Sequence, residues 1–118
     1  MLLFVGSHGI EVKKRLRKRI EYRLRFAANR FEQHLREIAV HLVDENGPRG
    51  GVDTVCRLTA RLHDGSAIRI EEKDTNIMLA IGRAAKRFRN VISRRIGRIK
   101  TQVHRGAPPA TATEIWIG

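Results

Sequence analysis

The chain has 118 residues, enough for one domain, and its 24 Lys and Arg against 12 Asp and Glu give a formal net charge of +12. Hydrophobic residues make up 42% of the chain, enough for one core, which excludes a wholly disordered polycation. Such an excess of positive charge predicts an anionic partner. Nucleic acid is the first candidate and an acidic membrane surface the second. Aromatic residues are only 5% of the chain, which argues against the stacking platforms that grip single-stranded nucleic acid.

Cys56 is the only cysteine of the chain, so it cannot form an internal disulfide, and no zinc pattern can be built from it. The five histidines are scattered without ligand spacing, and no Ser/His/Asp or paired-carboxylate pattern indicates catalysis. No apolar run approaches the roughly 18 residues of a membrane span, and the apolar start is too short for a signal peptide. We therefore expect a soluble cytoplasmic protein that is not an enzyme and needs no cofactor, small-molecule substrate or membrane.

The first half of the chain predicts a strand, a helix and a second strand. Residues 2–5 are a short apolar run typical of a buried strand, and glycines soon after it end the strand. Over 11–31, apolar residues recur every three or four positions and predict an amphipathic helix. They are Val12, Leu16, Ile20, Leu24, Ala27 and Phe31. Alternation over 38–43 predicts a strand, and Pro and Gly make 45–51 a flexible loop.

A hairpin follows this loop. The strict alternation over 56–63, where apolar residues alternate with polar ones, is the clearest strand signal of the chain. Asp64-Gly65 then predicts a two-residue type I′ turn. Residues 67–72 form the returning strand, with Ile68 and Ile70 on its core side.

The last predicted element is a second amphipathic helix, which Asp74 or Thr75 can cap and which ends near residue 101. Gly82 and Gly97 lie inside it at about 1 kcal/mol each relative to Ala. Either glycine can mark close packing, and Gly97 can also mark an early end. Residues 104–118 are typical of a flexible C-terminal tail.

The order of these elements predicts an α+β fold of the type β-α-β-β-β-α. A four-stranded, mostly antiparallel sheet with two helices packed on one face satisfies both periodicities. Residues 1–103 would form this single domain.

The positive charge gathers on the two helices, which carry 17 of the 24 basic residues. Helical phase places Lys14, Lys18 and Arg25 away from the core, with Arg17 on the flank. The second helix has no acidic residue, and Arg83, Lys86, Arg87, Asn90 and Arg94 lie opposite its apolar stripe. Because ordinary solvated helices mix signs, this pattern favours one basic surface that binds phosphates over a charged face that only keeps the protein soluble.

The other face of the sheet is less informative. Arg57, Arg61 and Arg69 project from it and either form a second contact surface or are solvated, with cross-strand pairing to Glu71. Cys56 alternates with Arg57 toward the core, so we interpret it as a small buried hydrophobe.

Two segments of the chain have the residue spacing of a known family. The first contains Ile10-Glu11-Val12, Leu16-Arg17, Ile20-Glu21 and Leu24, and the second contains Ile77, Ala80-Ile81, Arg87-Phe88 and Ile92. These segments resemble the opening and closing helices of the ribosome hibernation-promoting factors, also called ribosome-associated inhibitor A or sigma-54 modulation proteins. The strand order and the hairpin between them also agree, so the resemblance covers about residues 1–100.

The resemblance implies a fold similar to double-stranded RNA-binding domains and a translation inhibitor used in stress or stationary phase. It implies binding to the small ribosomal subunit and the 70S ribosome where mRNA and tRNA lie, through basic helix residues and rRNA phosphates. Arg17, Arg23, Arg87 and Arg94 match basic positions of the family, although Arg23 falls near the apolar stripe and must extend past it. With the helical phases, the predicted RNA-binding residues are Lys14, Arg17, Lys18, Arg23, Arg25, Arg83, Lys86, Arg87, Arg89 and Arg94.

The chain also departs from the family pattern. Lys13 stands where a Thr often caps the first helix, Met78 replaces a Tyr, Gly82 replaces an Asp or Asn, and Asn90 replaces an Arg. It looks like a short form without the dimerisation domain of long members, so we expect a monomer or weak dimer. Two alternatives stay open: a general double-stranded RNA or nucleoid-type binder, and a regulatory protein–protein module.

Overall fold

The computed structural model describes residues 1–45 and 53–104, with side chains up to residue 97. In chain order the elements are β1 (Leu2–His8), α1 (Lys14–Ala28), the 3-10 helix η1 (Asn29–His34), β2 (Leu35–Asp44), β3 (Thr54–Leu62), β4 (Ala67–Asp74) and α2 (Ile77–His104). The predicted α+β class and the order β-α-β-β-β-α are confirmed. The predicted loop and C-terminal tail lie outside the described residues, except for Glu45 and His104 at their starts.

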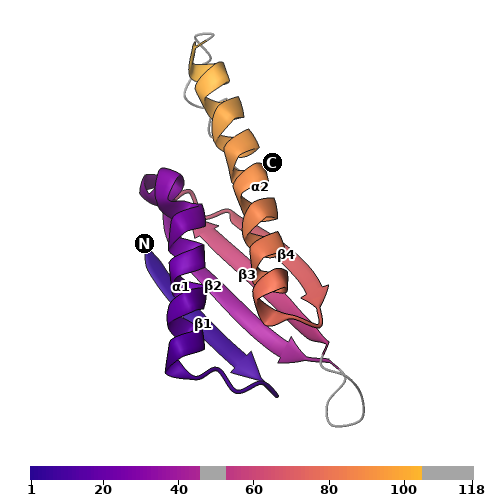
Figure 1. Cartoon of the computed structure of the whole chain (residues 1–118). Coiled ribbons are helices and arrows are strands. Elements are labelled where there is room, and N and C mark those ends of the chain that lie inside the picture. Colours follow the sequence, from indigo (N-terminus) through magenta and orange to yellow (C-terminus); the bar gives the residue numbers. More distant parts are fainter. Residues whose placement is uncertain (46–52, 105–118) are drawn as a thin grey trace.

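The four strands form one sheet in the order β1-β2-β3-β4. β1 runs parallel to β2, and the other neighbours are antiparallel, so the sheet is mostly antiparallel, as predicted. A parallel pair needs a crossover connection, which α1 provides. Both helices cover the same face of the sheet, side by side, and α2 extends past its end (Figure 1).

The core lies between this sheet face and the two helices. Alternate residues of β2 and β3, such as Ile38, Val40 and Leu58, are almost fully buried there. They meet the apolar stripes of the helices, where Ile20, Leu24, Ile81, Phe88 and Ile92 have almost no exposed surface. Cys56 is also fully buried, as expected, and burial with the nearby Glu72 charge raises the pKa of its thiol to about 12.

The prediction that the first strand is buried is correct for only one of its faces. Leu3 and Val5 pack against the core, whereas Leu2 and Phe4 are 61% and 50% exposed. The reason is position: β1 is an edge strand, and its outer side belongs to the sheet face that carries no helix in the described chain.

The first helix is shorter at both ends than the predicted 11–31. Residues 9–13 connect it to β1 outside the helix, and Lys13 is extended, at φ −72° and ψ 162°. After Ala28 the backbone tightens into η1, which keeps Phe31 in the core while the chain turns toward β2. The apolar period continues across this change, so the sequence pattern alone does not reveal it.

The turn between β3 and β4 is a three-residue loop, and the predicted type I′ turn is wrong. A type I′ turn needs positive φ at both central residues, but Gly65 alone has positive φ here, at 91°. The Gly65 N–H donates to the Leu62 carbonyl at 3.1 Å, and the Leu62 N–H donates to the Ser66 carbonyl at 2.9 Å. These bonds are typical of a type I turn followed by a left-handed residue, with Gly65 in that position.

The cap of α2 is Asn76 and neither of the two predicted residues. Its Oδ1 accepts hydrogen bonds from the Met78 and Leu79 backbone N–H groups at 2.9 and 3.2 Å. Asp74 instead accepts the Asn76 N–H at 2.8 Å, in the turn that leads into the helix. The helix also continues through Gly97 to His104, so Gly97 does not end it.

Candidate nucleic-acid interface

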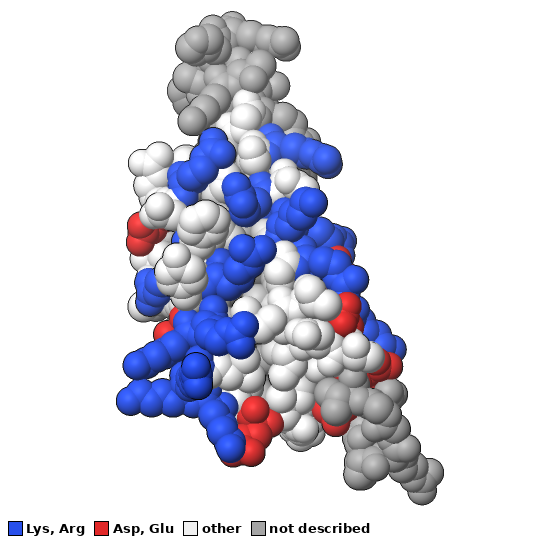
Figure 2. Space-filling view, in the orientation of Figure 1, with Lys and Arg blue, Asp and Glu red and all other residues white. Residues whose placement is uncertain are grey.

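The positive charge gathers on the helix face of the molecule. In Figure 2, Lys and Arg side chains lie over the start of α1, between the helices and along α2, with acidic side chains toward the margins. All ten predicted RNA-binding residues are exposed. Their surroundings differ, however, and divide them into groups with different capacities to bind an anion.

One group is the β4 flank, which we define as Arg83 and Arg87 with the acidic residues of β4 beside them. Arg87 Nη1 lies 3.0 Å from Glu72 Oε1 and also donates to the Glu71 carbonyl at 3.1 Å. Arg83 pairs with Asp74 and donates to the Lys73 carbonyl at 2.9 Å. Both guanidinium groups therefore already have carboxylate partners, and the charge of this flank is partly neutralised.

The pKa of the Asp74 carboxyl group depends on its contacts in this flank. The hydrogen bond from the Asn76 N–H lowers its pKa most, and the positive charge of Arg83 lowers that pKa further, whereas partial burial opposes both. The ionised carboxylate thus ties the end of β4 to the first turns of α2.

The second group is the helix seam, defined as Arg23 and Arg30 on the α1 and η1 side with Lys86 and Arg89 on the α2 side. None of these four side chains forms an ion pair within the part of the chain that the structure describes. Arg23 crosses the seam against Gly82, where its Nη2 lies 3.6 Å from the position of an added Cβ. The missing side chain of Gly82 thus leaves room for this guanidinium between the helices.

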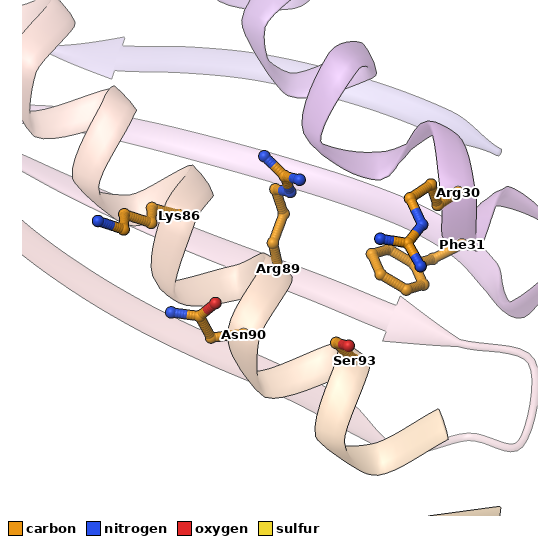
Figure 3. A pocket seen from close by; sticks show the side chains of 6 residues that line it. All are labelled: Arg30, Phe31, Lys86, Arg89, Asn90 and Ser93. Atoms are coloured by element: carbon orange, nitrogen blue, oxygen red, sulfur yellow. The ribbon is translucent and has the colours of Figure 1, made fainter. Parts of the chain in front are cut away.

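A hollow of about 290 Å³ lies at the η1 end of the helix seam. Its lining residues are Arg30, Phe31, Lys86, Arg89, Asn90 and Ser93. Figure 3 shows Arg89 reaching from α2 toward η1, where the Arg30 guanidinium lies over the Phe31 ring, 5.6 Å from its centroid. Three cations, an amide and a hydroxyl with no acidic lining residue suit a phosphate group.

The remaining predicted residues lie outside the helix seam. Lys14, Lys18, Arg25 and Arg94 are exposed on the helices. Arg17 turns toward the sheet, where its Nη1 donates to the Val5 carbonyl at 2.8 Å. Arg17 therefore also holds α1 against β1.

Sequence reasoning missed Arg30 and Ser93. Arg30 follows Arg23 by seven residues, and this spacing, which is visible in the sequence, places both on one side of a helix. Ser93 similarly follows Lys86 by seven residues and Arg89 by four. What the sequence does not reveal is that these two rows face each other across the seam.

A second, more apolar hollow of about 330 Å³ lies beside the middle of α1 and the first turn of α2. Its lining residues are Lys18, Arg19, Tyr22, Arg23 and Met78. Arg23 lines this hollow and also belongs to the helix seam.

Two further features limit the chemistry of the described residues. No group of three or more His, Cys, Asp or Glu in the described chain is placed to hold a metal ion. Within the same ranges, no helix is long and apolar enough to cross a membrane.

Solved structures share this fold. The crystal structure of the Thermus thermophilus Protein Y N-terminal domain has a TM-score of 0.66 and 22% identity, and the match covers 80% of this chain and 98% of that one. A ribosomal subunit interface protein from Coxiella burnetii has a TM-score of 0.64 and 13% identity, with 80% and 96% of the two chains covered. At these identities the likeness shows the fold. No curated protein matches the chain.

The family assignment comes from the sequence. The family model described as sigma 54 modulation protein / S30EA ribosomal protein matches residues 3–100. This range runs from the second residue of β1 through most of α2 and includes the helix seam and the β4 flank. The chain therefore belongs to the sigma 54 modulation protein / S30EA ribosomal protein family, as its two helices predict.

Proposed function

We propose that the protein is a ribosome hibernation factor that binds the small subunit and inhibits translation. It occupies the region where mRNA and tRNA bind, and it works in the cytoplasm, where the ribosomes are. Membership of a ribosome-associated family and two fold neighbours, one of them a ribosomal subunit interface protein, support ribosome association.

The observation that carries the proposal is the helix seam. On the β4 flank and on the sheet face without helices, several arginines have carboxylate partners: Arg57 pairs with Glu71, Arg61 with Glu37, and Arg87 with Glu72. The seam brings four cations together without any such partner among the described residues. Like charges repel, so this arrangement is unfavourable in the free protein, and phosphate groups between the helices relieve it.

The protein inhibits by occupying a site on the ribosome. The guanidinium and ammonium groups of the seam bind rRNA phosphates, and the body of the domain then fills space that translation needs. If about six phosphates are contacted, the logarithm of affinity falls with the logarithm of salt concentration with a slope of about −4 to −5.

Co-sedimentation with small subunits and 70S ribosomes tests this proposal. We expect stoichiometric binding at low salt, release as salt rises, and displacement by mRNA together with tRNA. Binding that saturating mRNA and tRNA leave unchanged would contradict occlusion. Equal affinity for an isolated RNA duplex and for the ribosome would instead indicate a general duplex binder.

A further inference from the structure

Two aromatic side chains stand out on the surface of α1. Tyr22 is 74% exposed and Phe26 is 61% exposed. They are four residues apart, so they are neighbours on the same side of the helix. Tyr22 is also the only tyrosine of the chain. Exposed aromatic rings cost free energy in water, and ordinary surfaces carry them singly.

The neighbours of Tyr22 are both apolar and positively charged. Its side chain lines the apolar hollow of about 330 Å³ beside the middle of α1 and the first turn of α2. Met78, in the first turn of α2, contributes a thioether, and Lys18, Arg19 and Arg23 contribute positive charge. The hollow thus combines an aromatic wall with a cationic rim.

The charges at this hollow all have one sign. No acidic residue lines it, and none of its three cations forms an ion pair within the described ranges. An occupant must therefore offer a flat apolar surface together with negative charge. An unpaired nucleotide has both, because its base can stack on an aromatic ring while its phosphates meet cations. The bases of a regular duplex are stacked inside and cannot enter.

We propose that this hollow receives one unpaired base of the ribosomal RNA, which stacks on the Tyr22 ring while Lys18, Arg19 and Arg23 bind the phosphates beside it. This inference rests on the proposed function and adds a preference for an unstacked nucleotide next to the helix seam. Arg23 belongs to both sites, so one RNA strand can follow the seam and present a base at its end. The low aromatic content argues against a stacking platform of several rings, whereas this site needs a single ring.

The first test compares Tyr22→Leu and Tyr22→Phe in binding to purified small subunits across a salt series. Stacking of one base implies about a 5- to 150-fold weaker affinity for Tyr22→Leu. Its salt slope stays that of the wild type, because no phosphate contact is lost. Tyr22→Phe keeps the ring and is expected to bind like the wild type. The matched control is Phe4→Leu, an exposed aromatic on the opposite face of the sheet, which leaves affinity unchanged.

The second test places p-benzoylphenylalanine at position 22 and photo-cross-links it in the complex with small subunits. The inference predicts a cross-link to an rRNA nucleotide outside a helix. A cross-link only to a ribosomal protein or to paired nucleotides overturns it, and so does unchanged affinity of Tyr22→Leu. In these cases the wild type still binds, so the proposed function stands. Failure of the wild type to bind subunits refutes the proposed function and this inference with it.

Discussion

Arg23 shows how a charged side chain is accommodated beside an apolar stripe. The helical phase places it near the edge of the core face of α1, yet the structure leaves it exposed between the helices. Its guanidinium lies against Gly82, which has no side chain to displace it. The contact distance of 3.6 Å is an ordinary van der Waals distance, so one added carbon fits at Gly82.

Three glycine substitutions distinguish the glycines inside α2 from the glycine in the turn between β3 and β4. Gly82→Ala and Gly97→Ala each raise the free energy of unfolding by about 0.5–1 kcal/mol, because alanine favours the helix interior and neither Cβ meets a close contact. Gly65→Ala lowers it by about 1 kcal/mol, since φ of 91° is unfavourable for a residue with a side chain. Urea unfolding midpoints measure all three. A Gly65→Ala variant as stable as the wild type contradicts the turn described here.

At the scale of elements, the two helices begin differently. Lys13 precedes α1 without a side-chain cap, and the first turn of α1 has no acidic residue. Asn76 caps α2 through two backbone N–H groups. The positive end of the α1 dipole therefore meets further positive charge, which is unfavourable in the free protein.

Substitution at these caps tests the difference. Lys13→Thr raises the free energy of unfolding by about 0.5–1 kcal/mol, because the hydroxyl caps α1 and a repelled charge is removed. Asn76→Ala lowers it by about 1 kcal/mol, because two N–H groups lose their acceptor. Chemical denaturation followed by circular dichroism measures both. Equal effects of the two substitutions would contradict the assignment of the caps.

The β4 flank gives stability a dependence on pH. The pKa of Asp74 is lowered from its usual 3.8 in the folded protein, chiefly by the Asn76 N–H and Arg83. Its ionised form therefore contributes stability above pH 3.8, and this contribution is lost as pH falls through the lowered folded pKa. In Asp74→Asn the amide oxygen still accepts the Asn76 N–H, but the pair with Arg83 is lost.

Urea unfolding of the wild type and Asp74→Asn at pH 7, 4 and 2 tests this dependence. We expect the wild type to be more stable at pH 7 and the difference to shrink as the pH falls below 4. A difference that stays constant down to pH 2 means that the Asp74 charge does not tie β4 to α2.

Sequence periodicity predicts these elements well, and local geometry less well. The alternation around Cys56 and Leu58 identifies β3 because successive side chains of a strand lie on opposite faces, so apolar residues alternate with polar ones. The turn at Gly65 and the cap at Asn76 depend on backbone torsions that several sequences allow. The partners of Arg87 come from β4, far away in sequence, so the charge pattern of α2 alone cannot reveal them.

At the scale of the whole molecule, the net charge of +12 comes from basic side chains of two kinds, those with a carboxylate partner and those without one. On the sheet face without helices, Arg57 and Arg61 each pair with a glutamate, at 3.3 and 3.2 Å. On the β4 flank, Arg83 and Arg87 are paired as well. Among the described residues, most of the unpaired positive charge is on α1 and in the helix seam, so the predicted single basic surface is divided into a paired flank and an open seam.

Two triple variants with the same loss of charge test the central role of the seam most directly. One carries Arg30→Gln, Lys86→Gln and Arg89→Gln, and the other carries Arg57→Gln, Arg61→Gln and Arg69→Gln on the opposite face. Each lowers the net charge by three. The measurement is the affinity for small ribosomal subunits across a salt series.

We predict that the seam triple binds more than about tenfold more weakly at physiological salt, because it loses charge-assisted hydrogen bonds of about 1.5–3 kcal/mol each. Its salt slope flattens by about 2, as expected for three lost phosphate contacts. The sheet-face triple stays near the wild type in both quantities. Equal loss of affinity in the two triples, or a seam triple that binds like the wild type, would contradict RNA binding through the helix seam.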